Sequence, residues 1–402
     1  MPRLAHSILF EFHDPISRLA GTLEVRRLMA ARSLQYLDSL ARDARSDVAL
    51  QLELASAYMR LGDIQGNPNR ANLGDTTGAL ESYNKARTIL REVLKTAPRH
   101  RLASLEMGRT LTLIGAQLVH VGEGARSLEV KRQAHAHWEN VAKDGTEDEL
   151  ARRGLAAAYS EMATATADHL PYKDRLAFGD RARVLYEKLL EARPADPERM
   201  RDLARIHKYL SGMCQDDADS MIAHAQKAAE LDERRVRAAA LDSTARMDLA
   251  QSLSMLATGW EKKGDLPKAT GFAQQSVDIR RALWEAEPKD HRVRDRLAYA
   301  LTLLGALRRK QADLRGALDP LSEAIEHTEA LAMNTYFYMA WHNLAWAHLE
   351  RAEVYHRLAS GDVCAEYRRA AEAYRRLAAH RREYYEKKLS ELRPKLASCG
   401  SR

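Results

Sequence analysis

Histidine is the residue type of this chain that could most readily bind a metal ion, because fifteen are present and His135 and His137 lie two positions apart. On a helix, side chains two positions apart point about 200° from one another, so these two imidazoles cannot share one metal ion. His342, His348 and His356, spaced by six and eight positions, cannot converge either, and no H-E-x-x-H pattern is present. The sequence therefore predicts no metal site.

Phosphate and nucleophile chemistry are not indicated either. Gly259 and Gly264 have the spacing of a phosphate-binding loop, but Asp265 stands where such a loop needs lysine, and the segment is predicted to be helical. The glycine-rich loop, H-R-D and D-F-G motifs of a protein kinase are absent. No Ser/His/Asp or paired-carboxylate arrangement can be assigned. These patterns predict a chain that is not an enzyme and takes no cofactor.

The cysteine positions and the hydropathy indicate in which compartment the chain is found. Cys214, Cys364 and Cys399 lie far apart and have no metal-ligand spacing, so the sequence predicts no disulfide framework. No apolar run approaches the roughly 18 to 20 residues of a membrane span, and the apolar stretch at the start is too short for a signal peptide. Read alone, the chain is predicted to be cytoplasmic.

Excess positive charge is concentrated near the C-terminus. The net charge is +7, and residues 351–402 hold 13 Lys/Arg against 7 Asp/Glu. A nucleic-acid surface would use such a patch. Tyr367, Tyr374 and Tyr384 recur there at helical spacing, however, which is typical of a packed face with the arginines on its solvated side. Nucleic-acid binding is therefore the less favoured interpretation.

One short pattern returns seven times along the chain: a large apolar residue, a small residue next to it, and a second small residue eight positions on. Its members are Leu54/Ala55/Gly62, Met107/Gly108/Gly115, Leu155/Ala156/Ala163, Leu203/Ala204/Ser211, Leu249/Ala250/Ala257, Leu297/Ala298/Gly305 and Leu344/Ala345/Ala352. Successive leading residues are 53, 48, 48, 46, 48 and 47 positions apart. A fixed period of this length predicts a repeat solenoid, a class that presents binding surfaces.

Each repeat is predicted to be a helical hairpin. In the fifth repeat, apolar residues recur at helical spacing over 247–263 and again over 266–287, with Gly264 between the two runs and Pro288 at the end. The small residues let helices approach closely, so enlarging Gly62, Gly115 or Gly305 should overpack that contact. His207 and His348 occupy the aromatic position of the repeat and are predicted to be core residues.

The large-small pair, the Ala79/Tyr83/Ala86 triplet and the closing Pro98 resemble tetratricopeptide repeats (TPR) over roughly residues 49–382. The resemblance implies an all-α solenoid of about seven helical hairpins in a right-handed superhelix. The unit of about 48 residues is longer than the usual ~34. We expect a connector and capping helix over 1–45, the repeat array over 46–380, and a capping helix with a frayed tail over 381–402.

A narrower resemblance lies at the start of the chain. Residues 9–14, 33–41, 62–68 and 71–75 are similar to the repeat region that follows the kinase domain in some large bacterial serine/threonine protein kinases. In those proteins a kinase domain and usually one membrane span come first. The resemblance implies, as an alternative, a sensory or docking region placed outside the cytoplasm, whose kinase is not part of these residues.

The TPR resemblance also implies a concave face lined by the first helix of each hairpin, at positions two before, two after and five after the large residue. Those positions hold Arg109, Arg153, Arg201, Arg205 and Lys208, followed by Met247, Gln251, Tyr299, His342 and Trp346. Arginine forks match carboxylates, so one hypothesis is an acidic peptide or helix bound there. The alternative is an ordinary solvated surface. The sequence thus predicts a non-catalytic protein-interaction scaffold, set in bacterial signalling.

Overall fold

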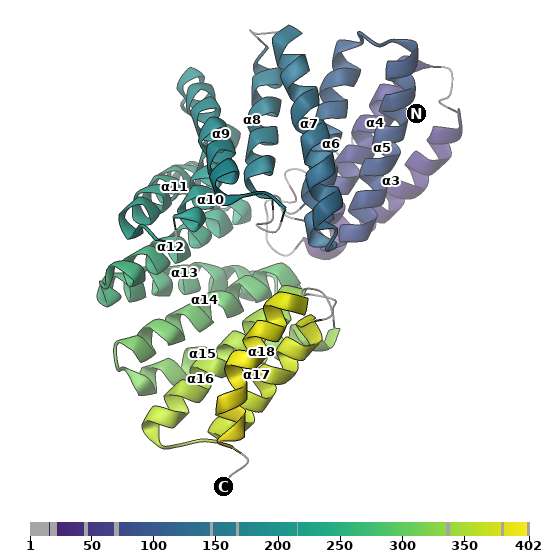
Figure 1. The fold of residues 1–402 in the computed structure, drawn as a ribbon. Helices are drawn as coiled ribbons and strands as arrows, with labels where there is room; N and C mark the ends of the chain where they lie inside the picture. Colours follow the sequence, from purple (N-terminus) through teal and green to yellow (C-terminus); the bar gives the residue numbers. More distant parts are fainter. Residues whose placement is uncertain are drawn as a thin grey trace. The chain divides into compact units, whose positions relative to one another are not determined.

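A computed structural model of the chain describes residues 16, 22–43, 47–67, 72–144, 148–165, 169–214, 216–334, 338–378 and 382–399. Every secondary-structure element in these ranges is an α-helix (Figure 1). The helices are α3 (Leu23–Asp43), α4 (Val48–Gly66), α5 (Thr76–Thr96), α6 (Arg101–His120), α7 (Gly124–Asp144), α8 (Glu149–Ala163), α9 (Tyr172–Ala192), α10 (Pro197–Met213), α11 (Ala218–Ala238), α12 (Ser243–Lys263), α13 (Leu266–Ala286), α14 (His291–Lys310), α15 (Leu314–Asn334), α16 (Tyr338–Leu358), α17 (Val363–Ala378) and α18 (Arg382–Ala397). The predicted all-α fold class is confirmed.

The chain divides into two compact units, and each is described by itself. Unit 1 comprises Met1–Met213 and Lys227–Ala245, and unit 2 comprises Cys214–Gln226 and Arg246–Arg402. In unit 1, each helix from α4 to α9 packs on the next. Among the first helices, α4 also contacts α6, and α6 also contacts α8. In unit 2, the same pattern joins consecutive helices from α13 to α18, with α14 also contacting α16. Both units are stacks of hairpins.

The predicted repeats coincide with these hairpins. Each of the seven leading residues lies in an even-numbered helix, from Leu54 in α4 to Leu344 in α16. An eighth first helix follows them, because Leu389, Ser390 and Ala397 of α18 repeat the large, small, small pattern 45 residues after Leu344. Sequence analysis missed this last member, and α18 packs on α17 as the first helix of one further repeat.

The hairpin ends follow from local chemistry. Asp47, Asp148 and Asp290 each accept hydrogen bonds from two backbone N–H groups of the first turn that they precede, and so cap α4, α8 and α14. Gly264 adopts φ +88° immediately after α12, a left-handed conformation that glycine adopts without steric cost. The predicted break between the two helices of the fifth repeat is confirmed at that residue.

Small residues set the spacing between the helices of a hairpin. A Cβ atom added at Gly62 would lie 2.5 Å from the ring of Tyr83 in α5. One added at Gly305 would lie 2.5 Å from Leu321 Cγ in α15. Tyr83 and Leu321 are fully buried, so neither side chain can move aside into solvent. The predicted packing role of these glycines is confirmed.

One predicted tyrosine position differs in the structure, and some of the residues discussed above lie outside the described ranges. Tyr384 was predicted to lie on a packed face but is 41% exposed, whereas its neighbour Tyr385 is buried at 2%. The start of α18 sets a different helical register from the one predicted. The tyrosine that faces the core is therefore Tyr385, one position after the predicted Tyr384. Residues 9–14, 68 and 71, which carry part of the resemblance to the kinase-associated repeat region, lie outside the described residues.

We expect Gly305→Val to lower the free energy of unfolding by about 1 to 3 kcal/mol, because the new side chain overlaps Leu321 in a close-packed contact. Urea denaturation followed by circular dichroism measures the change. Gly271→Ala is the matched control, since a Cβ there meets nothing within 4 Å and alanine favours a helix by up to about 1 kcal/mol. Equal stability of Gly305→Val and the parent chain would contradict the packing role.

Candidate functional site

The predicted basic positions of unit 1 lie on the first helices, where carboxylates of neighbouring repeats meet them. Arg153 of α8 donates through Nε to Asp202 of α10 at 2.8 Å and lies 3.7 Å from Glu198. Burial opposes the charged form of Arg153, but these carboxylates outweigh it and raise the pKa of its guanidinium. Arg153 therefore joins two successive repeats.

Arg201 and Arg205 also lie on α10, and both are half-buried. Burial opposes the charge of Arg205, but Tyr186, Asp202 and Glu161 favour it more strongly and hold its pKa above the ordinary value. The same site raises the pKa of the Tyr186 phenol, chiefly through burial. The structure thus places Arg153 and Arg205 beside one shared carboxylate rather than in an open basic row.

Lys208 and Arg109 are likewise held by carboxylates of this chain. Lys208 is 6% exposed, and its Nζ lies 2.7 Å from Asp232, which is fully buried. Arg109 is half-exposed and donates to the buried Asp63 at 3.3 Å. Lys208 is therefore a core residue, whereas Arg109 keeps part of its surface in solvent.

Opposite charges one repeat apart form a regular set of contacts between hairpins. The pairs separated by 46 to 50 residues include Lys85 with Asp38, Arg109 with Asp63, Arg101 with Asp148, Arg153 with Asp202, Arg199 with Glu149, and Lys310 with Glu261. A search for acidic and basic residues at the repeat period could have found these pairs in the sequence. That signal indicates pairing between repeats rather than charge reserved for a ligand.

The aromatic positions of unit 2 are arranged differently. The rings of Tyr299 in α14 and Trp346 in α16 lie 5.6 Å apart between centroids at an interplanar angle of 53°. Both side chains are partly exposed. Trp346 Nε1 donates to Glu350 at 3.2 Å, and Glu350 also accepts from Arg309 at 2.7 Å. This pair therefore offers a rigid apolar surface with a polar edge.

The other predicted positions contribute less to a shared surface. Met247 is half-buried and Gln251 is exposed on α12. His342 lies under α18, where its Nδ1 is 3.3 Å from the Tyr385 hydroxyl. The α18 helix thus contacts one of the predicted positions through Tyr385.

The buried histidines are structural. His348 is 1% exposed, and its Nδ1 lies 2.7 Å from Glu366, which also accepts two hydrogen bonds from Arg351. Burial raises the pKa of Glu366, but the contacts with His348 and Arg351 outweigh it and lower that pKa below the ordinary value. His207 is buried at 6%. The predicted core role of both histidines is confirmed.

No three His, Cys, Asp or Glu side chains within the described ranges gather in the arrangement of metal ligands. His135 instead contacts aromatic rings, with centroid distances of 4.8 Å to Tyr159 and 5.5 Å to Phe178. Burial lowers the pKa of its imidazole. This histidine therefore belongs to an aromatic packing cluster of α7, α8 and α9.

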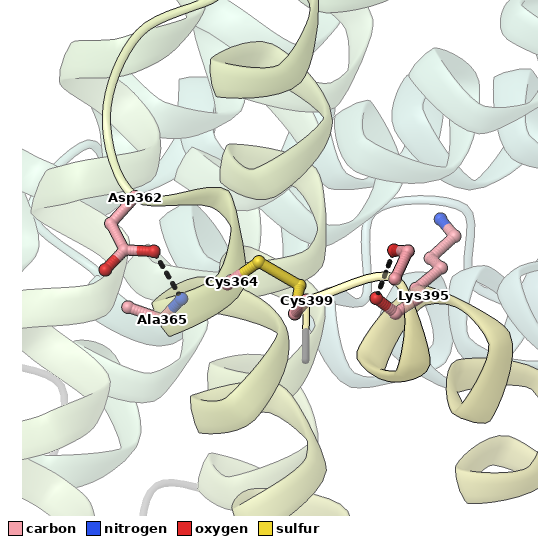
Figure 2. The surroundings of a disulfide bond; sticks show 6 residues. Asp362, Cys364, Ala365, Lys395 and Cys399 are labelled. Atoms are coloured by element: carbon pink, nitrogen blue, oxygen red, sulfur yellow. Dashed lines mark hydrogen bonds between the residues drawn. A yellow bond between two sulfur atoms is a disulfide. The ribbon is translucent and has the colours of Figure 1, made fainter. Parts of the chain in front are cut away.

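A disulfide bond joins Cys364 to Cys399, so the prediction that the sequence encodes no disulfide is wrong (Figure 2). The two residues are 35 positions apart, and the packing of α17 against α18 brings their Cα atoms to 5.6 Å. Asp362 accepts from Ala365 N–H at 2.8 Å and caps the start of α17 beside the bond (Figure 2). Residue 399, just after α18, is therefore joined covalently to the start of α17.

The residues that resemble the kinase-associated repeat region form a polar loop network. Asn67 Nδ2 donates to Asp63 at 2.7 Å, and Asn72 Nδ2 donates to the Asn67 carbonyl at 2.7 Å. Asn72 in turn accepts from Gly74 N–H at 2.8 Å, where the chain turns into α5. The motif therefore holds the α4–α5 connection, which is a structural role.

No helix within the described residues combines the length and apolar character that crossing a membrane requires.

Comparison with known proteins shows the fold. No protein-family model and no curated protein match the chain. Solved structures that are similar include a STAND signal-transduction ATPase with a tetratricopeptide repeat sensor from Pyrococcus horikoshii, at 11% identity and TM-score 0.51, covering 91% of this chain and 55% of that one. A Rap protein complexed with competence and sporulation factor matches at 13% identity and TM-score 0.50 over 99% of both chains. The chain therefore has a TPR-like helical-repeat fold.

We expect a double-mutant cycle on Arg153→Ala and Asp202→Ala to give a coupling energy of about 0.5 to 1 kcal/mol, because the ion pair is partly exposed and screened. Thermal or urea unfolding of the four proteins measures it, and 1 M NaCl should reduce it. Lys188→Ala with Asp202→Ala is the control cycle, since Lys188 is exposed on α9. A coupling of zero would leave Arg153 available to a ligand.

We expect Cys364→Ser with Cys399→Ser to weaken the attachment of α18, because a disulfide that closes a loop of this length restricts the unfolded chain by about 3 to 4 kcal/mol. Amide hydrogen exchange of α18 measures the change. Cys214→Ser is the control, since Cys214 lies outside this bond. Unchanged protection of α18 in the double variant would show that packing alone holds the helix.

Proposed function

We propose that this chain is a non-catalytic protein-interaction scaffold that binds a peptide or helical segment of a partner protein. One observation supports this most directly: Tyr299 and Trp346 occupy equivalent faces of successive first helices and keep part of their rings exposed. Aromatic residues dominate the energetics of protein interfaces, since they bury a large rigid area at low entropic cost. The site therefore suits an apolar or aromatic anchor of a partner.

The ion pairs within this chain indicate which unit is free to bind a partner. In unit 1, Arg153 and Lys208 contact carboxylates of this chain, so an acidic ligand would have to compete with Asp202 and Asp232. We therefore assign partner recognition to unit 2 rather than to the basic row over Arg109, Arg201 and Arg205. The fold likeness to TPR proteins agrees with a scaffold of this class.

We also propose a signalling context outside the reducing cytoplasm, as the regulatory region of a serine/threonine protein kinase. The resemblance at residues 33–41 and 62–75 supports the kinase association. The disulfide between Cys364 and Cys399 supports an oxidising compartment, because such bonds persist where thiols are not kept reduced. Alkylation of intact source cells, followed by mass measurement of this chain, distinguishes the oxidised pair from two free thiols.

We expect peptides selected from a displayed random 12-residue library by the full chain to lose at least tenfold in affinity for Tyr299→Ala and for Trp346→Ala. The reason is that each substitution removes one ring of the exposed pair. Fluorescence polarisation with a synthetic selected peptide measures the affinities. Tyr172→Ala is the control, because Tyr172 is 49% exposed on α9 in unit 1. Selected peptides that bind both variants as tightly as the parent chain would contradict the proposed site.

A further inference from the structure

Arg280 of α13 is an unusual buried cation. Its side chain is 2% exposed, and among the described residues no carboxylate lies within ion-pairing distance of its guanidinium. Nη1 donates to the Arg296 carbonyl at 3.0 Å, while Nε has no hydrogen-bond partner. A buried charge without a partner carries a desolvation cost of several kcal/mol. The Nε–H group of Arg280 is thus an unsatisfied buried donor.

Four other buried cations each contact a carboxylate: Lys131 with Glu161, Arg199 with Glu149, and Lys208 and Arg235 with Asp232. In these four cases the fold itself compensates the buried positive charge. The Arg280 guanidinium instead donates to the Arg296 carbonyl oxygen and lies near the Tyr299 ring.

The surroundings of Arg280 carry further positive charge. Arg296 of α14 is exposed, takes part in no ion pair among the described residues, and lies near enough to disfavour the charge on Arg280. Burial and this second guanidinium lower the pKa of Arg280 to about 9. Asp295, whose carboxylate favours the charge on Arg280, is 4% exposed and accepts from Asn343 at 2.9 Å. Two arginines thus face a single carboxylate that is already hydrogen-bonded.

The aromatic pair adjoins these arginines. The Arg280 guanidinium lies 6.0 Å from the centroid of the Tyr299 ring, and that ring lies 5.6 Å from Trp346. Tyr299 and Trp346 are partly exposed, and the buried cation lies beside the first of these two rings. Positive charge and aromatic surface therefore meet at one place in unit 2.

We propose that Arg280 and Arg296 form a binding site for one carboxylate group of the partner, next to an apolar group seated on Tyr299 and Trp346. This inference rests on the proposed function and names the ligand chemistry of the same surface. A planar carboxylate fits a guanidinium fork through two hydrogen bonds and would supply the missing partner of Nε. A ligand with one acidic group beside an aromatic or large aliphatic group meets both requirements.

The test uses the full chain and three small probes: 3-phenylpropionate, its neutral amide, and phenyl phosphate. Titration is followed through the arginine Nε–H resonances, and the Arg280 signal is assigned by its loss in Arg280→Met. We expect saturable binding of 3-phenylpropionate that shifts this resonance, and at least tenfold weaker binding of the amide. Tighter binding of phenyl phosphate than of the carboxylate would overturn the assignment, as would the absence of saturable binding.

Stability separates a ligand-binding role from a structural one. Arg280→Met removes an unpaired buried charge, so we expect the melting temperature without ligand to stay level or rise, while affinity for 3-phenylpropionate falls at least tenfold. Arg281→Met is the matched control, because Arg281 is the next residue and pairs with Glu323 at 2.6 Å. It should leave probe binding unchanged. A lower melting temperature together with unchanged affinity in Arg280→Met would show that Arg280 serves the fold.

The two proposals can fail separately. If selected peptides depend on Trp346 but bind Arg280→Met and the parent chain equally, the carboxylate site is wrong and the scaffold function stands. If 3-phenylpropionate binds at Arg280 while no displayed peptide binds the chain, the site exists and the scaffold function is wrong.

Discussion

The close approach of two helices within each hairpin is the constraint on which the rest of this structure depends. It requires a residue with little or no side chain eight positions after the large apolar residue, as at Gly62 and Gly305, because Tyr83 and Leu321 fill the space directly opposite. That contact brings the first helices of successive hairpins together. Every functional feature described above lies on those first helices or directly behind them, so the spacing of the hairpins positions the candidate surface.

Charge in this protein mostly serves the contacts between repeats. Arg153 with Asp202 and Lys310 with Glu261 join residues one repeat apart, and the buried Lys208 is compensated by Asp232. Such pairs add little to stability where they are exposed, but they favour one register of a stack whose units are otherwise alike. Arg153 and Lys208, predicted from residue types to be basic positions of a binding face, therefore already contact carboxylates of this chain. Arg280 differs because no carboxylate of the described residues lies within ion-pairing distance of it.

The α18 helix combines the packing of a repeat with a covalent bond. It has the small-residue pattern of a first helix, buries Tyr385 and Leu392, and contacts His342. A disulfide between Cys364 and Cys399 joins the residues just after α18 to the start of α17 (Figure 2). Packing and a covalent bond therefore act on the same pair of helices. Trp346 of the candidate surface lies one repeat before α18 in the chain, and Tyr299 lies two repeats before it.

The sequence by itself determined the helices, their ends and their period, because these depend on residues within a few positions of one another: the spacing of Leu297 and Gly305, the glycine at 264, the capping Asp290. The TPR resemblance also predicts which side of each first helix meets a partner, and this stays a prediction. Only the tertiary structure decided which carboxylate each arginine contacts, which cysteines pair, and that Arg280 is buried without an anion. These contacts involve residues that lie 16 to 49 positions apart in the sequence. A helical period alone does not specify how each helix is rotated about its own axis relative to its neighbour, and that rotation decides which side chains meet.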